Sequence, residues 1–300
     1  MSGIMLSVLS GGEAAIVYGA GSAIFGYGSP DTAITNLVSN TGVVSADVTG
    51  VGTDRWGLAA AGYSTDKAIF GYGYSGGNVS MTNLVSNTGV VASNVTGVGT
   101  ARRRLAAAKY GTDKAIFGYG TATAISSLTN LVSNTGVVSS DTTGVGTERE
   151  GPAAAGYGTD KAIFGYGNNN AGTNYSLTNL VSNTGVVSSD TTGVGTARGY
   201  LAAAGYSTDK AIFGYGLTNS AVSMTNLVSN TGVVSSDTTG VGTARYELAA
   251  AGYGTGKAIF GYGSPATAIT NLVSNTGVVS TDTTGVGTAR STLAAASFGG

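Results

Sequence analysis

Aromatic and charged side chains suited to ligand binding occur at a few irregular positions in this 300-residue chain. These candidate binding residues are Trp56, Tyr74, Arg103, Arg104, Glu150, Asn168, Asn169, Asn170, Tyr175, Tyr200 and Tyr246. Rigid aromatic side chains give a large contact area at low entropic cost, and nearby Ser, Gly and Asn give adaptable hydrogen bonds, as in antibody binding loops. Exposed Trp and Tyr also stack on sugar rings. The residue types therefore predict a binding surface for a glycan or a protein.

The chain contains neither cysteine nor histidine, which excludes much of the known catalytic and metal chemistry. Thiol nucleophiles, disulfides, Ser-His-Asp catalysis and the usual zinc sites all need one of these residue types. The sequence also has no phosphate-binding loop, metal-binding run of Asp or nucleophile elbow. We therefore predict a protein that is not an enzyme and that uses no cofactor and no metal.

The carboxylates give a weak case for glycoside hydrolysis. Glu148 and Glu150 lie close together beside Arg149, whereas a glycosidase needs two facing carboxylates about 5 Å or roughly 6.5 to 9.5 Å apart. We interpret this pair as part of a solvated, salt-bridged loop, with a sialidase-like hydrolase as an alternative.

Other charged residues recur at equivalent places in an internal repeat. The acidic position holds Asp47, Asn94, Asp141, Asp190, Asp237 and Asp282, and the basic position holds Arg55, Arg102, Arg149, Arg198, Arg245 and Arg290. A catalytic acid needs surroundings that set its pKa apart from that of its relatives, so repetition favours a structural role. The basic triplet Arg102–Arg104 is local, and we expect it in a solvated loop.

The repeat is recognised by one short phrase that occurs six times. KAIFGYG begins at Lys67, Lys114, Lys161, Lys210 and Lys257, and SAIFGYG begins at Ser22. Successive copies of its phenylalanine lie 45, 47, 47, 49 and 47 residues apart. The consensus around it is LAAAGYGTDKAIFGYG, a variable segment, TNLVSNTGVVSSDTTGVGTAR and two variable residues. Repeats of about 40 to 50 residues are typical of propeller blades or helical arrays.

Local composition favours strands over helices. KAIF, TNLV and TGVV are short runs rich in β-branched and aromatic residues, and SNTG and GTDK have the chemistry of hairpin turns. The 51 glycines interrupt any window long enough for a stable helix, and each costs about 1 kcal/mol relative to Ala. Each repeat is therefore predicted to hold four antiparallel strands, within LAAAGY, KAIFGY, TNLVS and GVVSSDTTGVGTAR.

Six such units arranged around an axis would cover one another's faces and leave short edges. We therefore predict an all-β fold, a six-bladed β-propeller of four-stranded antiparallel blades, as a single domain over residues 1–300. The blades are expected at about 13–55, 57–102, 104–149, 152–198, 200–245 and 247–290, with an N-terminal extension at 1–12 and a closing tail at 291–300. The alanines of LAAAGY suit the crowded innermost strand.

The two chain ends compete for one place in this arrangement. Glu13–Gly28 aligns with the first two strands of a repeat, yet Leu293–Phe298 is a seventh copy of the innermost strand. We expect the ends to meet in blade one and close the ring. The displaced strand is expected alongside blade one or on a neighbouring copy, which would give a homo-oligomer through the chain ends.

The segments that vary in sequence are predicted to lie on one face. They are the loops between the second and third strands, such as Tyr74–Met81 and Asn168–Leu177, and the two residues after each repeated Arg. In an antiparallel unit both connections fall on the same side, and the repeated turns GTDK and SNTG fall on the other. The residues after each Arg lead into innermost strands, so they should form an inner ring with the loops as an outer wall. Drift of unconstrained loops is the alternative explanation of the variation.

The run TNLVSNTGVVSSDTTGVGTAR-xx-LAAAGYGTDKAIFGYG resembles the Kelch repeat, in which a strand and turn lead to an Arg, a small-residue inner strand and an apolar strand that ends in glycines. The resemblance extends over all six repeats. Kelch blades usually carry a Tyr in the third strand and a Trp after its turn, where this chain has Val, as at Val38 and Val43. The resemblance therefore implies blade geometry and no ligand site. The chain is also similar to repeat proteins of tailed bacteriophages, which implies a virion or host-attachment role.

Charge and hydropathy narrow the range of partners. The net charge is −1 and charged residues make up 10% of the chain, so long-range attraction to nucleic acid or anionic lipid is absent. Ile4–Leu9 is too short for a membrane span or a signal peptide. We expect no nucleic-acid partner and no membrane insertion, and a location on a virion or outside the cell. The expected partner is a glycan or protein on a cell surface, or another virion protein; an architectural subunit that stacks through its faces is the alternative.

Overall fold

The computed structural model describes residues 20–299, which form six three-stranded antiparallel sheets and no helix. The first sheet combines the two ends of the described chain, in the order β18 (Ala294–Phe298), β1 (Ser22–Gly28) and β2 (Thr32–Val38). The other sheets are numbered two to six along the chain. The second contains β3 (Ala59–Tyr63), β4 (Lys67–Gly71) and β5 (Thr82–Val85), and the third contains β6 (Ala106–Tyr110), β7 (Lys114–Gly118) and β8 (Thr129–Val132). The fourth contains β9 (Ala153–Tyr157), β10 (Lys161–Gly165) and β11 (Thr178–Val181), the fifth contains β12 (Ala202–Tyr206), β13 (Lys210–Gly214) and β14 (Thr225–Val228), and the sixth contains β15 (Ala249–Tyr253), β16 (Lys257–Gly261) and β17 (Thr270–Val273). The prediction of an all-β chain built from repeated antiparallel units is confirmed.

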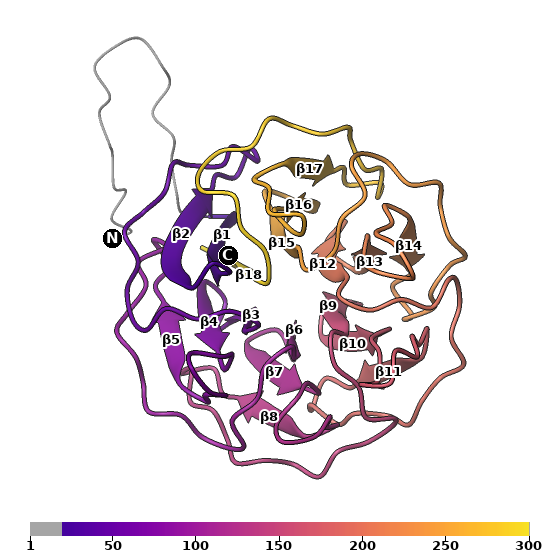
Figure 1. Ribbon diagram of the computed structural model, residues 1–300, viewed down its shortest axis with the longest axis horizontal. Helices are drawn as coiled ribbons and strands as arrows, with labels where there is room; N and C mark the ends of the chain where they lie inside the picture. Colours follow the sequence, from indigo (N-terminus) through magenta and orange to yellow (C-terminus); the bar gives the residue numbers. More distant parts are fainter. Residues whose placement is uncertain (1–19, 300) are drawn as a thin grey trace.

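The sheets lie around a central axis with their alanine-rich strands innermost (Figure 1). Each inner strand contacts the next in the order β18, β3, β6, β9, β12, β15 and back to β18. Strand β1 pairs with β18 from Ser22↔Phe298 to Gly26↔Ala294, so the two ends of the described chain meet in the first sheet. The C-terminal strand is therefore the innermost strand of that sheet. Residues 13–19, which carry the competing copy of the innermost strand in the sequence, lie outside the described residues.

Residue size explains the order of strands within each sheet. The inner strands read AAAGY or a close variant and alternate between buried and half-buried residues, because only small side chains fit near the axis. The middle strands are buried from their second residue onward, since neighbouring sheets cover both of their faces. Gly71 ends one of them because a Cβ there would lie 2.7 Å from the Phe117 ring of the next sheet. Apolar packing between sheets therefore depends on the repeated phrase.

The predicted fourth strand is not a strand in the structure. The segment after each SNTG turn contacts the third strand through only two isolated bridges, as in Val85↔Val91 and Thr82↔Val95. The side chain of Asn83 accounts for part of this irregularity, because its Nδ2 donates to the carbonyl of Ala92 at 2.9 Å, between those two bridges. Side chains thus replace a regular ladder at the outer edge.

Two closed belts of backbone hydrogen bonds join the six sheets. The first, here called the upper belt, links Gly57, Arg104, Gly151, Tyr200, Glu247 and Thr292, each of which donates its N–H to the preceding member at 2.7–2.9 Å. All six have a left-handed backbone, with φ between 51° and 64°, which costs about 1 to 2 kcal/mol for a residue other than glycine. The second, the lower belt, runs through the turns at the opposite ends of the inner strands, where Ser64 donates to Asp113, Gly111 to Asp160, Gly158 to Asp209, Ser207 to Gly256, Gly254 to Gly21 and Gly299 to Asp66.

The repeated arginines connect strands within a sheet and contact the sheet before it. Arg102 is fully buried and donates from Nε to the carbonyl of Tyr119 at 2.9 Å, from Nη1 to that of Thr100 at 3.1 Å and from Nη2 to Oδ1 of Asn130 at 2.6 Å. Its guanidinium also lies 4.5 Å from the centre of the Tyr72 ring of the second sheet. This geometry gives the arginines a structural role, as their repetition predicts.

The repeated Asp residues link one unit to the next. Asp141 accepts hydrogen bonds from the N–H and hydroxyl of Thr100, which belongs to the preceding unit, and from Nδ2 of Asn130. Asp47 accepts the equivalent bonds from Thr288 across the junction of the chain ends. Their pKa values are lowered because these hydrogen bonds outweigh the effect of burial, which acts in the opposite direction. The Asp residues therefore hold neighbouring units together as carboxylates.

Candidate functional site

The variable segments lie on one face, here called the variable face, as chain connectivity predicts. In all six sheets the first residue after the repeated Arg pairs with the first residue of the loop: Trp56↔Tyr74, Arg103↔Thr121, Glu150↔Asn168, Gly199↔Leu217, Tyr246↔Ser264 and Ser291↔Ser29. The second residue after each Arg belongs to the upper belt. The residues after Arg therefore form the inner ring, with the loops outside them.

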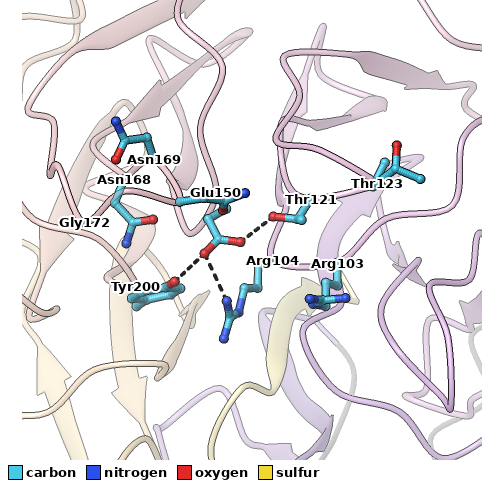
Figure 2. A pocket seen from close by; sticks show the side chains of 11 residues that line it. Arg103, Arg104, Thr121, Thr123, Glu150, Asn168, Asn169, Gly172 and Tyr200 are labelled. Carbon is cyan, nitrogen blue, oxygen red and sulfur yellow. Dashed lines mark hydrogen bonds and ion pairs between the residues drawn. The ribbon is translucent and has the colours of Figure 1, made fainter.

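A pocket of about 530 Å³ opens on this face where the third, fourth and fifth sheets meet. Figure 2 shows its side chains gathered around the carboxylate of Glu150. The lining includes seven of the candidate residues predicted from the sequence, namely Arg103, Arg104, Glu150, Asn168, Asn169, Asn170 and Tyr200. A pocket of this volume is within the range that small-molecule sites occupy.

Glu150 is the centre of the pocket's hydrogen-bond network. Only 5% of its surface is exposed, and Oε1 accepts hydrogen bonds from the Tyr200 hydroxyl at 2.6 Å and from Arg104 Nη1 at 3.0 Å. Oε2 accepts the hydroxyl of Thr121. Arg104 and Thr121 adjoin the third sheet, Glu150 the fourth and Tyr200 the fifth, so the carboxylate links three neighbouring sheets.

Electrostatics keep this carboxylate ionised. Burial alone would raise the pKa of Glu150, but the hydrogen bonds from Thr121 and Tyr200 and the charge of Arg104 outweigh it and lower the pKa below its ordinary value. Burial, together with the hydrogen bond to Glu150, raises the pKa of Tyr200 to about 12. The pair therefore consists of an anionic acceptor and a neutral phenol donor at neutral pH.

A row of aromatic rings and guanidinium groups extends from the pocket toward the second sheet. The rings of Trp56 and Tyr74 lie 5.0 Å apart, and the Arg103 guanidinium lies 5.7 Å and 5.1 Å from their centres. Arg104 lies 5.9 Å from the centre of Trp56 and 5.1 Å from that of Tyr200. Cation–π contacts of this kind contribute about 0.5 to 1 kcal/mol at exposed sites. The row presents flat apolar surfaces beside charged hydrogen-bond donors.

Three buried polar atoms around the pocket have no hydrogen-bond partner among residues 20–299. They are Nε of Arg103, Nε of Arg104 and Oδ1 of Asn168. An unpaired buried polar atom costs about 1 to 3 kcal/mol, and such atoms are rare enough in folded proteins to need an explanation. Arg103 has one polar partner, Asn78, whose Oδ1 accepts its Nη1 at 3.0 Å, and no carboxylate pairs with it among the described residues.

The structure brings together ten of the eleven predicted residues. Trp56 and Tyr74 join through Arg103, and the hydroxyl of Tyr175 lies 3.3 Å from Nδ2 of Asn169. Tyr246 lies apart, since its backbone pairs with Ser264 in the sixth sheet and it does not line the pocket.

Sequence reasoning missed several small residues of the site. Thr121, Ala122, Thr123 and Gly172 line the pocket, and Asn78 holds Arg103. They all occur in the variable loops. The pairing of each loop's first residue with the residue after the repeated Arg would have indicated Thr121, because Arg103 is its partner.

Two expectations about charged loops are wrong. The triplet at Arg102 is not a solvated loop, because Arg102 is fully buried in the scaffold and the other two arginines, Arg103 and Arg104, line the pocket. Glu150 is not part of a solvated pair either, since its ion pair is with Arg104, while Glu148 is exposed. The reason is that Arg103 and Glu150, as first residues after a repeated Arg, pair with the first residues of the variable loops and so lie at the pocket.

Glu247 was not predicted as a site residue, and it belongs to the upper belt opposite Arg104. Burial raises its pKa, the positive charge of Arg104 and a hydrogen bond with Ser291 lower it, and the charge of Glu150 raises it.

Between residues 20 and 299, no three or more acidic side chains group together in a way that could hold a metal ion. Within the same residues, no helix is present that could span a membrane.

Comparison with known proteins gives no family for this chain: no protein-family model matches it, and no curated protein matches it.

Proposed function

We propose that the six sheets form a six-bladed propeller with Kelch-like blades, and that its variable face is a non-enzymatic recognition surface for a glycan or a protein on a cell surface. The bridged outer segment would take the place of the fourth strand in each blade. A role in host attachment on a phage particle is consistent with this proposal and with the resemblance of the repeats to phage-encoded proteins.

The observation that carries the proposal is the combination of unpaired polar atoms at the pocket with an aromatic surface next to it. Two donors, on Arg103 and Arg104, and one acceptor, on Asn168, lack partners. The rings of Trp56 and Tyr74, whose planes are tilted by 37° to each other, lie beside Arg103. A sugar has hydroxyl groups that can bond to the unpaired polar atoms and an apolar ring face that can pack on the aromatic rings. A polar protein loop offers the same two features.

The test is a binding screen with matched charge variants. Wild-type protein, Arg103→Ala and Lys114→Ala would be applied to a glycan array and to immobilised cell-surface proteins. Lys114 lies at the start of a middle strand, next to the repeated turns, and is exposed, so its loss changes net charge equally without touching the pocket. We expect retention of wild type and Lys114→Ala and loss of Arg103→Ala; equal retention of all three would contradict the proposal.

An architectural subunit is the second candidate, and one observation favours it. Six exposed valines follow the repeated SNTG turns, one in each unit: Val43, Val90, Val137, Val186, Val233 and Val278. They are 48–66% exposed, and a ring of identical apolar side chains suits contact with a second copy that has the same repeat. Assembly of purified protein into stacks that Val137→Ser and Val233→Ser together abolish would favour this function.

Glycoside hydrolysis is the less favoured alternative. A general acid at neutral pH needs a raised pKa, whereas the pKa of Glu150 is lowered and its carboxylate already accepts three hydrogen bonds. Glu247 has a raised pKa, so the pair Glu150 and Glu247 is the one to examine. Release of reducing sugar from a glycan retained in the screen would replace the recognition proposal with this one.

A further inference from the structure

A second cavity occupies the centre of the ring, and its lining shares no residue with that of the variable-face pocket. Its volume is about 880 Å³, and its wall consists largely of alanines and glycines from the six inner strands. Turn residues of the repeated face, including Thr65, Thr208 and Thr255, also line it, whereas no residue of the upper belt does. The cavity therefore lies along the inner strands and reaches the repeated face.

All the charges that line this cavity are positive. Four lysines, Lys67, Lys109, Lys210 and Lys257, belong to its lining, and no Asp or Glu of residues 20–299 does. This is unexpected for a chain whose net charge is −1. Charges of one sign inside low-dielectric walls focus the electric field and concentrate ions of opposite sign.

Lys109 is the only one of these lysines that departs from the repeat. The corresponding residues of the other inner strands are Gly62, Gly156, Gly205, Gly252 and Ser297. A small residue therefore suffices for folding at this position, and packing does not explain a lysine there. Its side chain extends into a space that the other five strands leave open.

The ammonium group of Lys109 has neither a hydrogen bond nor an ion pair within residues 20–299. Burial lowers its pKa, and the charges of Asp113 and Asp66 act in the opposite direction from outside the cavity lining. A partly buried cation without a direct partner is costly unless something pairs with it.

We propose that the central cavity binds a small organic anion, whose carboxylate or phosphate group pairs with Lys109. Lys67, Lys210 and Lys257 lie in the repeated-face part of the lining, where they attract the anion, and the alanine wall contacts its apolar part. This site is independent of the recognition surface on the variable face, because no residue is shared between the two.

The test compares anion binding by wild type with binding by three variants. Isothermal titration at pH 7 would use inorganic phosphate and succinate as probes and glycerol as the uncharged control. Lys109→Gly restores the residue that four other inner strands carry, so the fold is expected to be retained, and a thermal melt checks this. Lys109→Arg keeps the charge, and Lys114→Ala removes a lysine outside the cavity.

We expect one anion to bind per chain, with at least tenfold weaker binding by Lys109→Gly and near wild-type binding by Lys109→Arg and Lys114→Ala. Preference for phosphate over succinate, or the reverse, identifies the anionic group. Absence of binding by wild type, or equal binding by wild type and a folded Lys109→Gly variant, would overturn the proposal.

Discussion

Arg102 and Arg103 are neighbours in the chain, yet they belong to two regions that differ in how many of their side-chain polar atoms have a hydrogen-bond partner. Arg102, in the repeated scaffold, is fully buried, and each of its three nitrogens donates to a partner in the protein. Arg103, in the variable pocket, is half-buried, and its Nε has no partner. In the scaffold, Nε of five of the six repeated arginines has a partner and only that of Arg149 lacks one, whereas in the pocket both Arg103 and Arg104 have an unpaired Nε. Substitutions in the first region should therefore reduce stability, and those in the second should reduce binding.

The largest effect is expected from removing the strand that joins the two ends of the ring. Deleting residues 291–300 removes β18, one member of each hydrogen-bond belt and the buried side chains of Leu293 and Phe298. We expect a loss of at least about 5 kcal/mol, which is roughly a third or more of the stability of an ordinary domain. Thermal denaturation followed by circular dichroism, with size-exclusion chromatography, measures it. An unchanged melting temperature and elution volume would show that β18 does not close the ring.

The second-largest effect, a loss of stability, is expected from replacing the scaffold arginines, which differ in the hydrogen bond made by Nε. Arg198 donates from Nε to the carbonyl of Tyr215 at 2.7 Å, whereas Nε of Arg149 has no partner. Removing one member of a buried charged network costs about 3 to 5 kcal/mol, so we expect a loss of this size for Arg198→Ala. Arg149→Ala should cost about 1 kcal/mol less, because it breaks one bond fewer. Urea unfolding of both variants tests the order, and a larger loss for Arg149→Ala would contradict it.

In the variable region, Trp56→Ala should weaken ligand binding and leave the fold intact. Aromatic anchors at an interface commonly contribute 2 kcal/mol or more, which is about a thirtyfold change in affinity. We expect a change of less than about 1 kcal/mol in stability, since Trp56 is only half-buried. The control is Thr112→Ala, in a repeated turn on the opposite face. If the affinity falls with Thr112→Ala and not with Trp56→Ala, the ligand binds at the repeated face and the prediction is wrong.

The smallest effect is a pH-dependent one at Glu150. Its pKa is lower in the folded protein than in the unfolded chain, so its contribution to stability is present above the unfolded value and is lost as pH falls through the folded value. Glu150→Gln should therefore cost about 1 to 2 kcal/mol at pH 7. The difference from wild type should shrink below about pH 4. Urea unfolding between pH 3 and 7 measures it, and a difference that stays constant over this range would show that charge is not involved.

Most of the scaffold follows from the sequence. The six copies of KAIFGYG or its variant SAIFGYG predicted the number of sheets. The alternation of apolar runs with turn residues predicted three strands of each sheet, because strand and turn formation depend on local chemistry. The order of connections placed the variable segments on one face without any knowledge of side-chain contacts. The fourth strand was predicted wrongly because Asn side chains, such as that of Asn83, take hydrogen bonds that a strand ladder would use.

What only the tertiary structure decided is which variable residues meet. Local reasoning paired Glu150 with Arg149, its neighbour in the chain, yet its partners are Arg104, Tyr200 and Thr121, which lie 46, 50 and 29 residues away. Tyr246 has the same residue type as Tyr200 and a nearby place in the repeat, but it is the first residue after its Arg and Tyr200 is the second, so their side chains point to different neighbours. The sequence by itself therefore determined the scaffold and the face on which variation falls, because these depend on residues close in the chain. The pocket depends on contacts between neighbouring sheets, and those are set by the packing of the whole chain.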